Sequence, residues 1–278
     1  MYSSIESTKD IYTLLYSYIT FHNGKEIQND LDSFIEIALN ENDYTLSTGL
    51  LGAGWLLSYL HFNEIFNDDL DELLYDFDDN FYLLAVKLVV HPCPTLEDLL
   101  QVINYFQQRL QNKSISYNFY RRFVLFETMK MLVEKLISLS MSYEMTRSDL
   151  ARTILKFSYL ASTCVSEKDI EECYYKQTEQ LITYYQTQED LLDEDIYNLK
   201  LVQLASIQFG NPHWISQISN MLNRGASPNY TESDSILDAL ILFLENNKND
   251  AYDLNKCDFK NNKNLLYILT SNVKRLTF

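Results

Sequence analysis

Glycine and proline are scarce in this chain, which has 6 glycines and 4 prolines among its 278 residues. At average usage these two residue types would together make up roughly 12% of a chain. Sandwiches, barrels and propellers need a turn roughly every eight to twelve residues, and glycine and proline supply most such turns. The scarcity therefore argues against all-β architectures and predicts an all-α protein.

Basic residues are also in short supply, because 22 Lys and Arg stand against 39 Asp and Glu and the net charge is −17. Binding to nucleic acid needs a basic patch, and anionic membrane surfaces also attract positive charge. We see no basic patch and expect neither partner. No stretch approaches the ~18 apolar residues of a membrane span, and the first residues lack the basic and apolar regions of a signal peptide. These absences predict a soluble, cytoplasmic protein.

Cysteine is the third scarce residue type, with Cys93, Cys164, Cys173 and Cys257 far apart in the sequence. They form no C-x-x-C pair and are too few for a disulfide framework in a chain of this length. We therefore expect free thiols in a reducing compartment.

Helix-start signals recur along the chain as a Ser or Thr followed three residues later by an Asp. These pairs are Ser7/Asp10, Thr95/Asp98, Thr146/Asp149, Ser166/Asp169, Thr187/Asp190 and Thr231/Asp234. Apolar residues spaced three and four apart predict about twelve helices. Their expected ranges are 8–22, 26–40, 47–62, 69–90, 95–111, 115–141, 146–163, 167–186, 188–209, 213–223, 231–246 and 261–275. The links between them are short, which favours antiparallel neighbours in a single domain over residues 1–278.

Two consecutive segments differ in polarity. The segment from Leu50 to Leu60 is apolar on nearly every side, which predicts a helix that is buried all round. The next segment, residues 68–90, has acids on one face and apolar side chains on the other. Those apolar side chains are Leu73, Leu74, Phe77, Phe81, Leu84 and Leu88. This succession predicts a two-layer α/α arrangement with an inner ring inside an outer ring, although a bundle or an α-solenoid would give a similar alternation.

Three of the six glycines, Gly49, Gly52 and Gly54, lie at the start of the apolar segment. Glycine inside a helix costs about 1 kcal/mol relative to alanine, so three together need a compensating reason. Close approach of another chain segment is the usual reason. Such an approach would also leave N–H groups accessible at the positive end of the helix dipole.

The segment from Ser47 to His61 resembles the G-x-x-G inner-helix repeat of the lanthionine synthetase C-like family. The resemblance covers residues 44–85 and includes the acidic stretch 68–78. It implies an (α/α) toroid, complete or incomplete, of inner and outer helices. In catalytic members it also implies a zinc ion, held by two Cys and one His, that activates a peptide cysteine for addition to a dehydrated Ser or Thr.

The zinc ligands of the catalytic members are missing from this sequence, and the glycine repeat occurs once. The nearest imitation is Cys164 with His213, where Pro212 stands in place of the second thiolate. A catalytic zinc needs three protein ligands. We therefore expect no metal, no cofactor, no catalytic residue and no zinc-dependent thioether cyclase activity, and we interpret the pair His91 and Cys93 as an interhelical turn.

The resemblance therefore implies a catalytically degenerate relative that binds a peptide or protein partner in a peptide-maturation pathway for natural products. The residues implied in peptide binding are Gly49, Gly52, Gly54, Trp55, Tyr59 and His61. A bound peptide is expected to be basic, because an acidic cavity attracts cations. Close helix packing would explain the same residues and remains open.

Two further functions also remain open. Toroids host glycoside hydrolases and lyases that use paired carboxylates as acid and base. Candidates for such pairs are Asp76, Asp78, Asp79, Asp193, Glu194 and Asp195, although clusters of this kind arise easily in a chain with 39 acids. The other alternative is an α-helical scaffold for protein–protein interaction without a small-molecule site.

Aromatic side chains are abundant, with 21 Tyr and 15 Phe. They could line a peptide or sugar groove, but at helical spacing aromatics are more typical of a core whose hydroxyls reach the surface. The aromatic run 117–123 contains the pair Arg121 and Arg122. We interpret this pair as an intramolecular partner for the acidic excess rather than as a phosphate site.

Overall fold

A computed structural model of the chain describes residues 11, 14–15, 24–62, 69–112, 119–141, 145–161, 167–188 and 190–224. Of these residues 85% are helical and none lies in a strand, so the prediction of an all-α protein is confirmed. Within the described ranges, no helix combines the length and the apolar character that crossing a membrane requires. The predicted helices 231–246 and 261–275 lie outside the described residues, as does most of 8–22.

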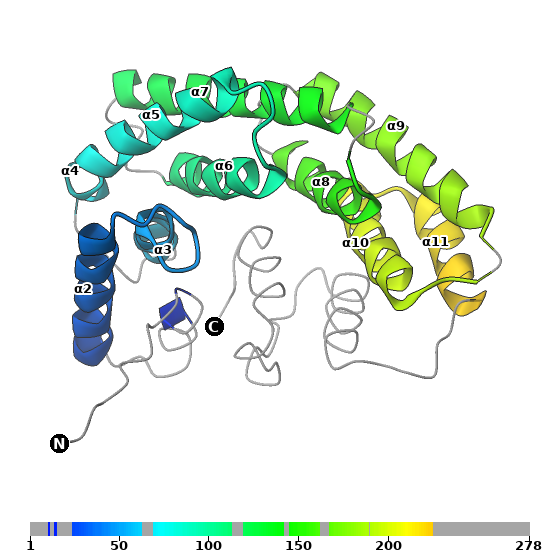
Figure 1. The fold of residues 1–278 in the computed structure, drawn as a ribbon, viewed down its shortest axis with the longest axis horizontal. Helices are drawn as coiled ribbons and strands as arrows, with labels where there is room; N and C mark the ends of the chain where they lie inside the picture. The colour runs from blue at the N-terminus through cyan, green and yellow to red at the C-terminus, as the bar shows by residue number, and fades with distance from the viewer. Residues whose placement is uncertain are drawn as a thin grey trace. The chain divides into compact units, whose positions relative to one another are not determined.

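The helices group into two compact units, and the division falls after Leu132, inside α7. The first unit holds α2 (Gly24–Glu41), α3 (Leu50–Phe62), α4 (Leu70–Leu73), α5 (Tyr75–Val90), α6 (Leu96–Gln111) and the start of α7 (Phe119–Ser140) (Figure 1). The second unit holds the rest of α7 with α8 (Arg147–Leu160), α9 (Glu167–Gln186), α10 (Asp193–Phe209) and α11 (Pro212–Arg224). A single domain over the whole chain stays a prediction.

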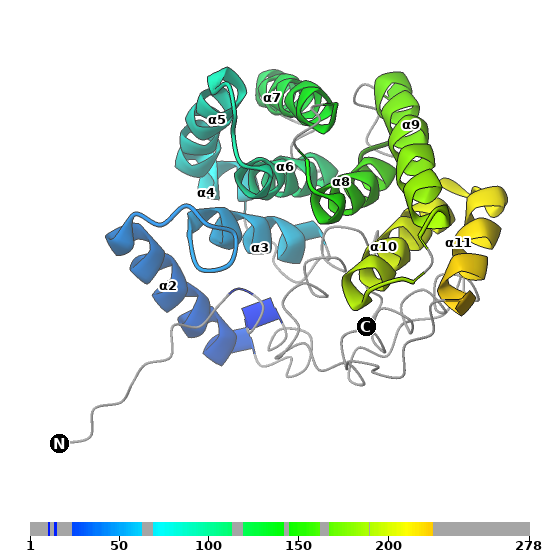
Figure 2. The same ribbon diagram turned by 45° about the vertical axis from the view of Figure 1, so that its right-hand side comes forward.

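Helix α3 is the centre of the first unit. It packs chiefly against α6 and also contacts α2, α4 and α5 (Figure 2). Every residue from Leu50 to Leu60 is buried, which confirms the predicted helix with no solvent face. Since α3 has almost no polar side chains, the charged groups of this unit come from the helices around it.

The second unit is built on the contact between α8 and α10, although α9 lies between them in the sequence. Helix α9 packs on α8, and α11 packs on α10. Ile154 and Phe157 on α8 and Val202 and Ala205 on α10 are fully buried. Helices that are neighbours in space are thus not always neighbours in the sequence, and a two-layer arrangement requires such pairs. Whether the helices form the ring of a toroid, closed or open, stays a prediction.

Two predicted helix starts are confirmed by their caps. The hydroxyl oxygen of Thr95 accepts the N–H of Asp98 at 3.1 Å, and Thr146 accepts the N–H of Asp149 at the same distance. In both pairs the hydroxyl also donates to the Asp carboxylate. The caps predicted at Ser7, Ser166 and Thr231 lie outside the described residues.

The helix start predicted at Thr187 is wrong. The hydroxyl of Thr187 donates to the carbonyl of Tyr184, within the end of α9, at 2.7 Å. Helix α10 begins at Asp193 instead of residue 188, and the carboxylate of Asp195 accepts the N–H of Leu192 at 3.0 Å. At the actual helix start, Asp195 rather than a threonine hydroxyl satisfies an N–H group, that of Leu192.

The single helix predicted over 69–90 is interrupted at Leu74, where φ is −96° and ψ is 14°. This break separates α4 from α5. Leu74 and Phe81 are fully buried as predicted, but Leu73 is turned to solvent. Asp78, which the sequence placed on an acidic face, is also buried.

Candidate functional site

The three glycines at the start of α3 lie at points of close approach. A Cβ atom on Gly49 would stand 2.5 Å from the carbonyl oxygen of Asp43, and one on Gly52 would meet the carbonyl oxygen of Leu46. A Cβ atom on Gly54 would stand 2.7 Å from Cε2 of Tyr105. Close approach, predicted from these glycines, is confirmed.

The N–H groups at this helix start are already occupied. Leu50 donates to the carbonyl of Asp43 at 2.8 Å, while Gly49 and Gly52 donate to the carbonyl of Thr45 at 3.1 and 3.3 Å. The expectation that these N–H groups face a ligand is therefore wrong for these three residues. The segment 43–46, which requires glycine at positions 49 and 52, also supplies the carbonyls that satisfy the helix end.

The segment 43–46 is held in shape by Asp43. Its carboxylate accepts the N–H of Thr45 at 2.8 Å and the hydroxyl of Thr48 at 2.7 Å. Burial alone would raise the pKa of Asp43, but the hydrogen bonds from Thr48 and Thr45 outweigh burial and hold that pKa below its usual value. Asp43 thus acts as a local cap for the turn before α3.

The other predicted peptide-binding residues are Trp55, Tyr59 and His61. Trp55 and Tyr59 are buried, with their rings stacked at 5.2 Å between centroids. His61 is partly exposed, and its Nδ1 lies 3.0 Å from Oδ1 of Asn112. The structure buries five of the six predicted residues and leaves only His61 partly exposed, and peptide contact by the six stays a prediction.

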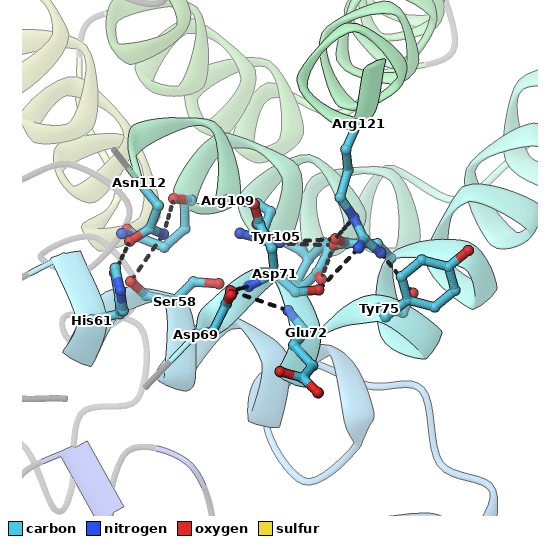
Figure 3. A network of polar contacts seen from close by, with 12 residues as sticks. Ser58, His61, Asp69, Asp71, Glu72, Tyr75, Tyr105, Arg109, Asn112 and Arg121 are labelled. Carbon is cyan, nitrogen blue, oxygen red and sulfur yellow. Dashed lines mark hydrogen bonds and ion pairs between the residues drawn. The ribbon is translucent and has the colours of Figure 1, made fainter. Parts of the chain in front are cut away.

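Helices α4, α5, α6 and α7 enclose a buried charge network made of Asp71, Asp78, Tyr105, Arg109 and Arg121 (Figure 3). Oδ1 of Asp78 accepts the hydroxyl of Tyr105 at 2.5 Å and Nε of Arg109 at 3.2 Å. Its Oδ2 accepts Nη2 of Arg109 at 3.0 Å and Nε of Arg121 at 2.9 Å. Arg109 also donates to Oδ1 of Asp71 at 2.7 Å. Two carboxylates therefore balance two guanidinium groups.

Arg121 fixes the start of α7 against the break between α4 and α5. Its Nη1 donates to the carbonyl of Asp71 and its Nη2 to the carbonyl of Tyr75, both at 2.9 Å. The guanidinium carbon also lies 4.4 Å from the ring centre of Tyr75. The interpretation of Arg121 as an intramolecular partner for the acidic excess is confirmed.

The charge network raises the pKa values of both Arg109 and Tyr105. Burial alone would lower the pKa of Arg109, but the charges of Asp78 and Tyr105 and the hydrogen bonds of the network raise it. Burial and the charge of Asp78 together raise the pKa of Tyr105 well above its usual value. At neutral pH Arg109 therefore stays charged and Tyr105 stays protonated, and neither exchanges a proton.

Three of the six candidate carboxylates for a glycosidase or lyase form hydrogen bonds or ion pairs within the fold. Asp78 belongs to the charge network, and Asp195 caps the start of α10. Glu194 accepts the hydroxyl of Ser148 at 2.5 Å. Asp76, Asp79 and Asp193 are exposed, as expected for solvated helix faces.

Within the described ranges, no three His, Cys, Asp or Glu side chains come together to hold a metal ion. His213 lies 2.9 Å from the side-chain nitrogen of Gln217, and Cys164 lies outside the described residues. The N–H of Cys93 donates to Nδ1 of His91 at 3.2 Å, which closes the turn predicted at this pair.

Three aromatic side chains at the start of α7 point away from the charge network. Phe119, Tyr120 and Phe123 are 82%, 76% and 52% exposed. At ~100° per residue, Phe119 and Phe123 lie about 160° around the helix from the inward-facing Arg121. We call these three residues the aromatic stripe. The prediction that aromatics of the run 117–123 belong to the core is wrong for them.

Unpaired acids also lie exposed on α4 and α5. Glu72, Asp76 and Asp79 are exposed, and none of them has an ion pair within the described part of the chain. We call them the acidic edge. Tyr75, on α5, is 57% exposed. Helical spacing places Phe119 and Phe123 on the opposite side of α7 from Arg121. This spacing predicts that the two rings are exposed only when it is known that Arg121 is buried.

No family model matches the sequence, and neither curated proteins nor solved structures give a match. The resemblance of residues 44–85 to the lanthionine synthetase C-like family therefore stays a prediction. Function has to be inferred from the geometry of the described residues.

Proposed function

We propose that this protein is a helical scaffold that binds a short segment of a peptide or of another protein. The observation that carries the proposal is the aromatic stripe, three large aromatic side chains exposed together at one helix end. Folded proteins leave few large aromatics together in water, and binding hot spots are enriched in aromatic side chains. Binding of a partner would explain why these three aromatic side chains are exposed, whereas a helix face that contacts only water would not.

The position of the stripe also favours binding. Arg121, bonded to Asp78 and to two main-chain carbonyls, holds the first turn of α7 in place. A surface that is already rigid loses less conformational freedom when a partner binds. The charge network therefore serves recognition indirectly, because it pre-organises the stripe.

The resemblance to the lanthionine synthetase C-like family supports a peptide as the partner. In this proposal the protein is a catalytically degenerate relative in a peptide-maturation pathway, and the glycine-rich start of α3 supports the fold. The hydrolase or lyase alternative gains no support from the acids, because Asp78, Glu194 and Asp195 are engaged with other groups.

A random peptide library displayed on phage tests the proposal. We expect repeated selection on the folded chain to enrich peptides that share a sequence pattern, and synthetic copies to bind saturably in isothermal titration calorimetry. The same selection on the urea-unfolded chain removes peptides that adhere to any apolar surface. Selection that yields no shared pattern, or only peptides whose binding never saturates, would overturn the proposed function.

A further inference from the structure

We propose that the exposed face of α5 packs against the same face of a second copy of this chain, with the two helices antiparallel about a two-fold axis. The observation that carries this pairing is a row of three exposed side chains on α5, which are Asp79, Leu83 and Lys87. Residues four positions apart lie one above another on the same side of a helix. We call these three residues the α5 ridge. The pairing involves α5 alone and is independent of the proposed function.

The α5 ridge lies on the side of the helix that is turned away from the interior of the first unit. Phe81 and Ala85 are fully buried. At ~100° per residue, Leu83 lies about 160° around the helix from each of them. Figure 2 shows α5 at an outer edge of the first unit, with α6 on its inner side. A second copy can therefore approach the ridge without displacing the core.

Apolar side chains extend the exposed face on both sides of Leu83 along the helix. Leu83 is 56% exposed, and Tyr82 and Val90 are 38% and 76% exposed. Val86 is partly exposed. All three neighbours lie within about 100° of Leu83 around the helix. Apolar side chains that gather on one exposed face are typical of an interaction site, whereas a single exposed leucine is not.

The two charged members of the α5 ridge have no partner of opposite charge nearby. Neither Asp79 nor Lys87 forms an ion pair within the described part of the chain. On α5, no residue of opposite charge lies three or four positions from either of them. Both charges are therefore available to a second molecule.

Antiparallel pairing centred on Leu83 satisfies every member of the ridge. Leu83 of one copy meets Leu83 of the other. Because Asp79 and Lys87 lie four residues before and four residues after Leu83, each Asp79 then lies opposite Lys87 of the other copy. Two-fold symmetry repeats this contact, so the leucine pair lies between two ion pairs. Parallel pairing would instead place like charges opposite one another, which electrostatic repulsion opposes.

The size of the contact sets the expected strength of the dimer. One helix from each copy buries little area compared with a standard interface, so the dimer should dissociate on dilution. We expect a dissociation constant of about 10 µM, which makes the chain a monomer at about 1 µM and mainly a dimer at about 100 µM. The net charge of −17 repels two copies at long range. Salt at about 0.15 M screens that repulsion beyond about 8 Å, whereas the ion pairs form at contact.

The mass in solution tests the pairing, measured by size-exclusion chromatography with multi-angle light scattering between about 1 and about 100 µM protein in about 0.15 M salt. Leu83→Ser, Asp79→Lys and Lys87→Glu should each remain monomeric at the highest concentration. An equimolar mixture of Asp79→Lys and Lys87→Glu should form dimers again, because every charge on one variant then lies opposite its complement on the other. The double variant Asp79→Lys/Lys87→Glu should pair with itself for the same reason. Both single variants stay strongly acidic, so opposite net charges cannot cause their pairing.

Matched control variants separate the α5 ridge from general effects of charge and hydrophobicity. Leu39→Ser is the control for Leu83→Ser, because both leucines are 56% exposed. Glu179→Lys and Lys168→Glu make the same changes of net charge at exposed positions on α9. All three controls should form dimers like the unaltered chain. Since every substituted position is exposed, circular dichroism should show each variant folded.

An unaltered chain that keeps the mass of one copy at every concentration would overturn the inference. Dimers that persist in Leu83→Ser, Asp79→Lys and Lys87→Glu would also overturn it, because the contact would then lie elsewhere on the molecule. A mixture of the two charge-reversed variants that stays monomeric would show that Asp79 and Lys87 do not lie opposite one another. Equal loss of dimers in the ridge variants and in their controls would assign association to net charge or general hydrophobicity.

Discussion

Tyr105 donates a 2.5 Å hydrogen bond to Asp78, and both side chains are buried. The ring of the same tyrosine packs edge-on against Phe81, with 4.5 Å between ring centres, and lies 2.7 Å from where a Cβ atom on Gly54 would be. One side chain therefore ties the glycine-rich helix to the charge network.

Replacing Asp78 with alanine should be strongly destabilising. The change leaves Arg109 and Arg121 buried without the carboxylate that both of them contact. Loss of one partner from a buried ion pair costs about 3–5 kcal/mol, because the remaining charge stays desolvated. Urea denaturation followed by circular dichroism should show a free energy of unfolding lower by that amount.

Asp79→Ala is the control for that substitution, since Asp79 is the adjacent acid and is exposed. Its effect should stay within about 0.5 kcal/mol, as for most surface changes. Tyr105→Phe, which removes only the hydroxyl, should fall between the two. Equal stability of Asp78→Ala and Asp79→Ala would show that the charge network does not hold the first unit together.

Gly52→Ala should also destabilise the protein, although helix propensity predicts the opposite sign. Alanine in place of glycine inside a helix stabilises by about 1 kcal/mol when there is room. Here the new Cβ meets the carbonyl oxygen of Leu46 and lies 3.2 Å from Cδ1 of Ile11, so the segment before α3 has to move. Overpacking of this kind costs about 1–3 kcal/mol.

Gly210→Ala provides the comparison for a purely conformational cost. Gly210 has φ of 66°, and no atom lies within 4 Å of the position that a Cβ would take, so only the left-handed backbone opposes alanine. That cost is about 1 kcal/mol. Thermal unfolding of both variants should rank Gly52→Ala as the less stable, and a stabilised Gly52→Ala would mean that the glycines are not there for close packing.

Much of the helical framework was predictable because apolar spacing is a local property. Residues 50–60 leave no polar face whichever way the helix is turned, so their burial followed from the sequence alone. Asp78 was not predictable in this way. Its burial depends on Arg109 and Arg121, which lie 31 and 43 positions away in the sequence.

The aromatic stripe shows the same limit of local reasoning. Phe119 and Phe123 have the helical spacing typical of core residues. Which face of α7 is buried, however, depends on the ion pair between Arg121 and Asp78. The six residues predicted to bind peptide were recognised as special through their glycines. What Gly49 and Gly52 accommodate, the segment 43–46, could not be identified from the spacing.

Thr48→Val should lower stability in a pH-dependent way. The hydroxyl of Thr48 donates to Asp43, and the hydrogen bonds to this carboxylate hold its pKa below the usual 3.8. A carboxyl with a lowered pKa adds stability above pH 3.8, and that stability is lost as pH falls through the folded-state pKa. The variant should be less stable than the unaltered chain by about 0.5–1 kcal/mol at about pH 6, a small amount because solvent screens a partly exposed group.

The stability difference caused by Thr48→Val should shrink as Asp43 becomes protonated. Urea titrations at several pH values between about 6 and about 2.5 measure it, provided the chain still folds at the acid end. Thr187→Val is the control, because the hydroxyl of Thr187 donates to the carbonyl of Tyr184 and not to a carboxylate. A difference that is constant with pH for Thr48→Val would show that its hydroxyl does not act through Asp43.

The effect of Lys156→Met on stability should be more favourable at neutral pH than at alkaline pH. Lys156 is buried on α8, and burial lowers its pKa from 10.5 to about 7. Between these two values the unfolded chain binds a proton that the folded chain does not, so the stability contributed by Lys156 rises with pH by about 1.4 kcal/mol per unit. Below about pH 7 both states are protonated and the cost of burying the charge is present in full.

Methionine removes the titrating group while keeping a long apolar side chain, so the unfolding free energy of the variant minus that of the unaltered chain should be most positive near about pH 6 and fall steadily toward about pH 9. Urea denaturation of both proteins across that range measures the difference and cancels the titration of every other group. Lys168→Met, at an exposed position on α9, should show no such slope. A slope shared by both variants would assign the effect to net charge, whereas a slope confined to Lys156→Met would establish that the interior of the second unit opposes a charge at this position.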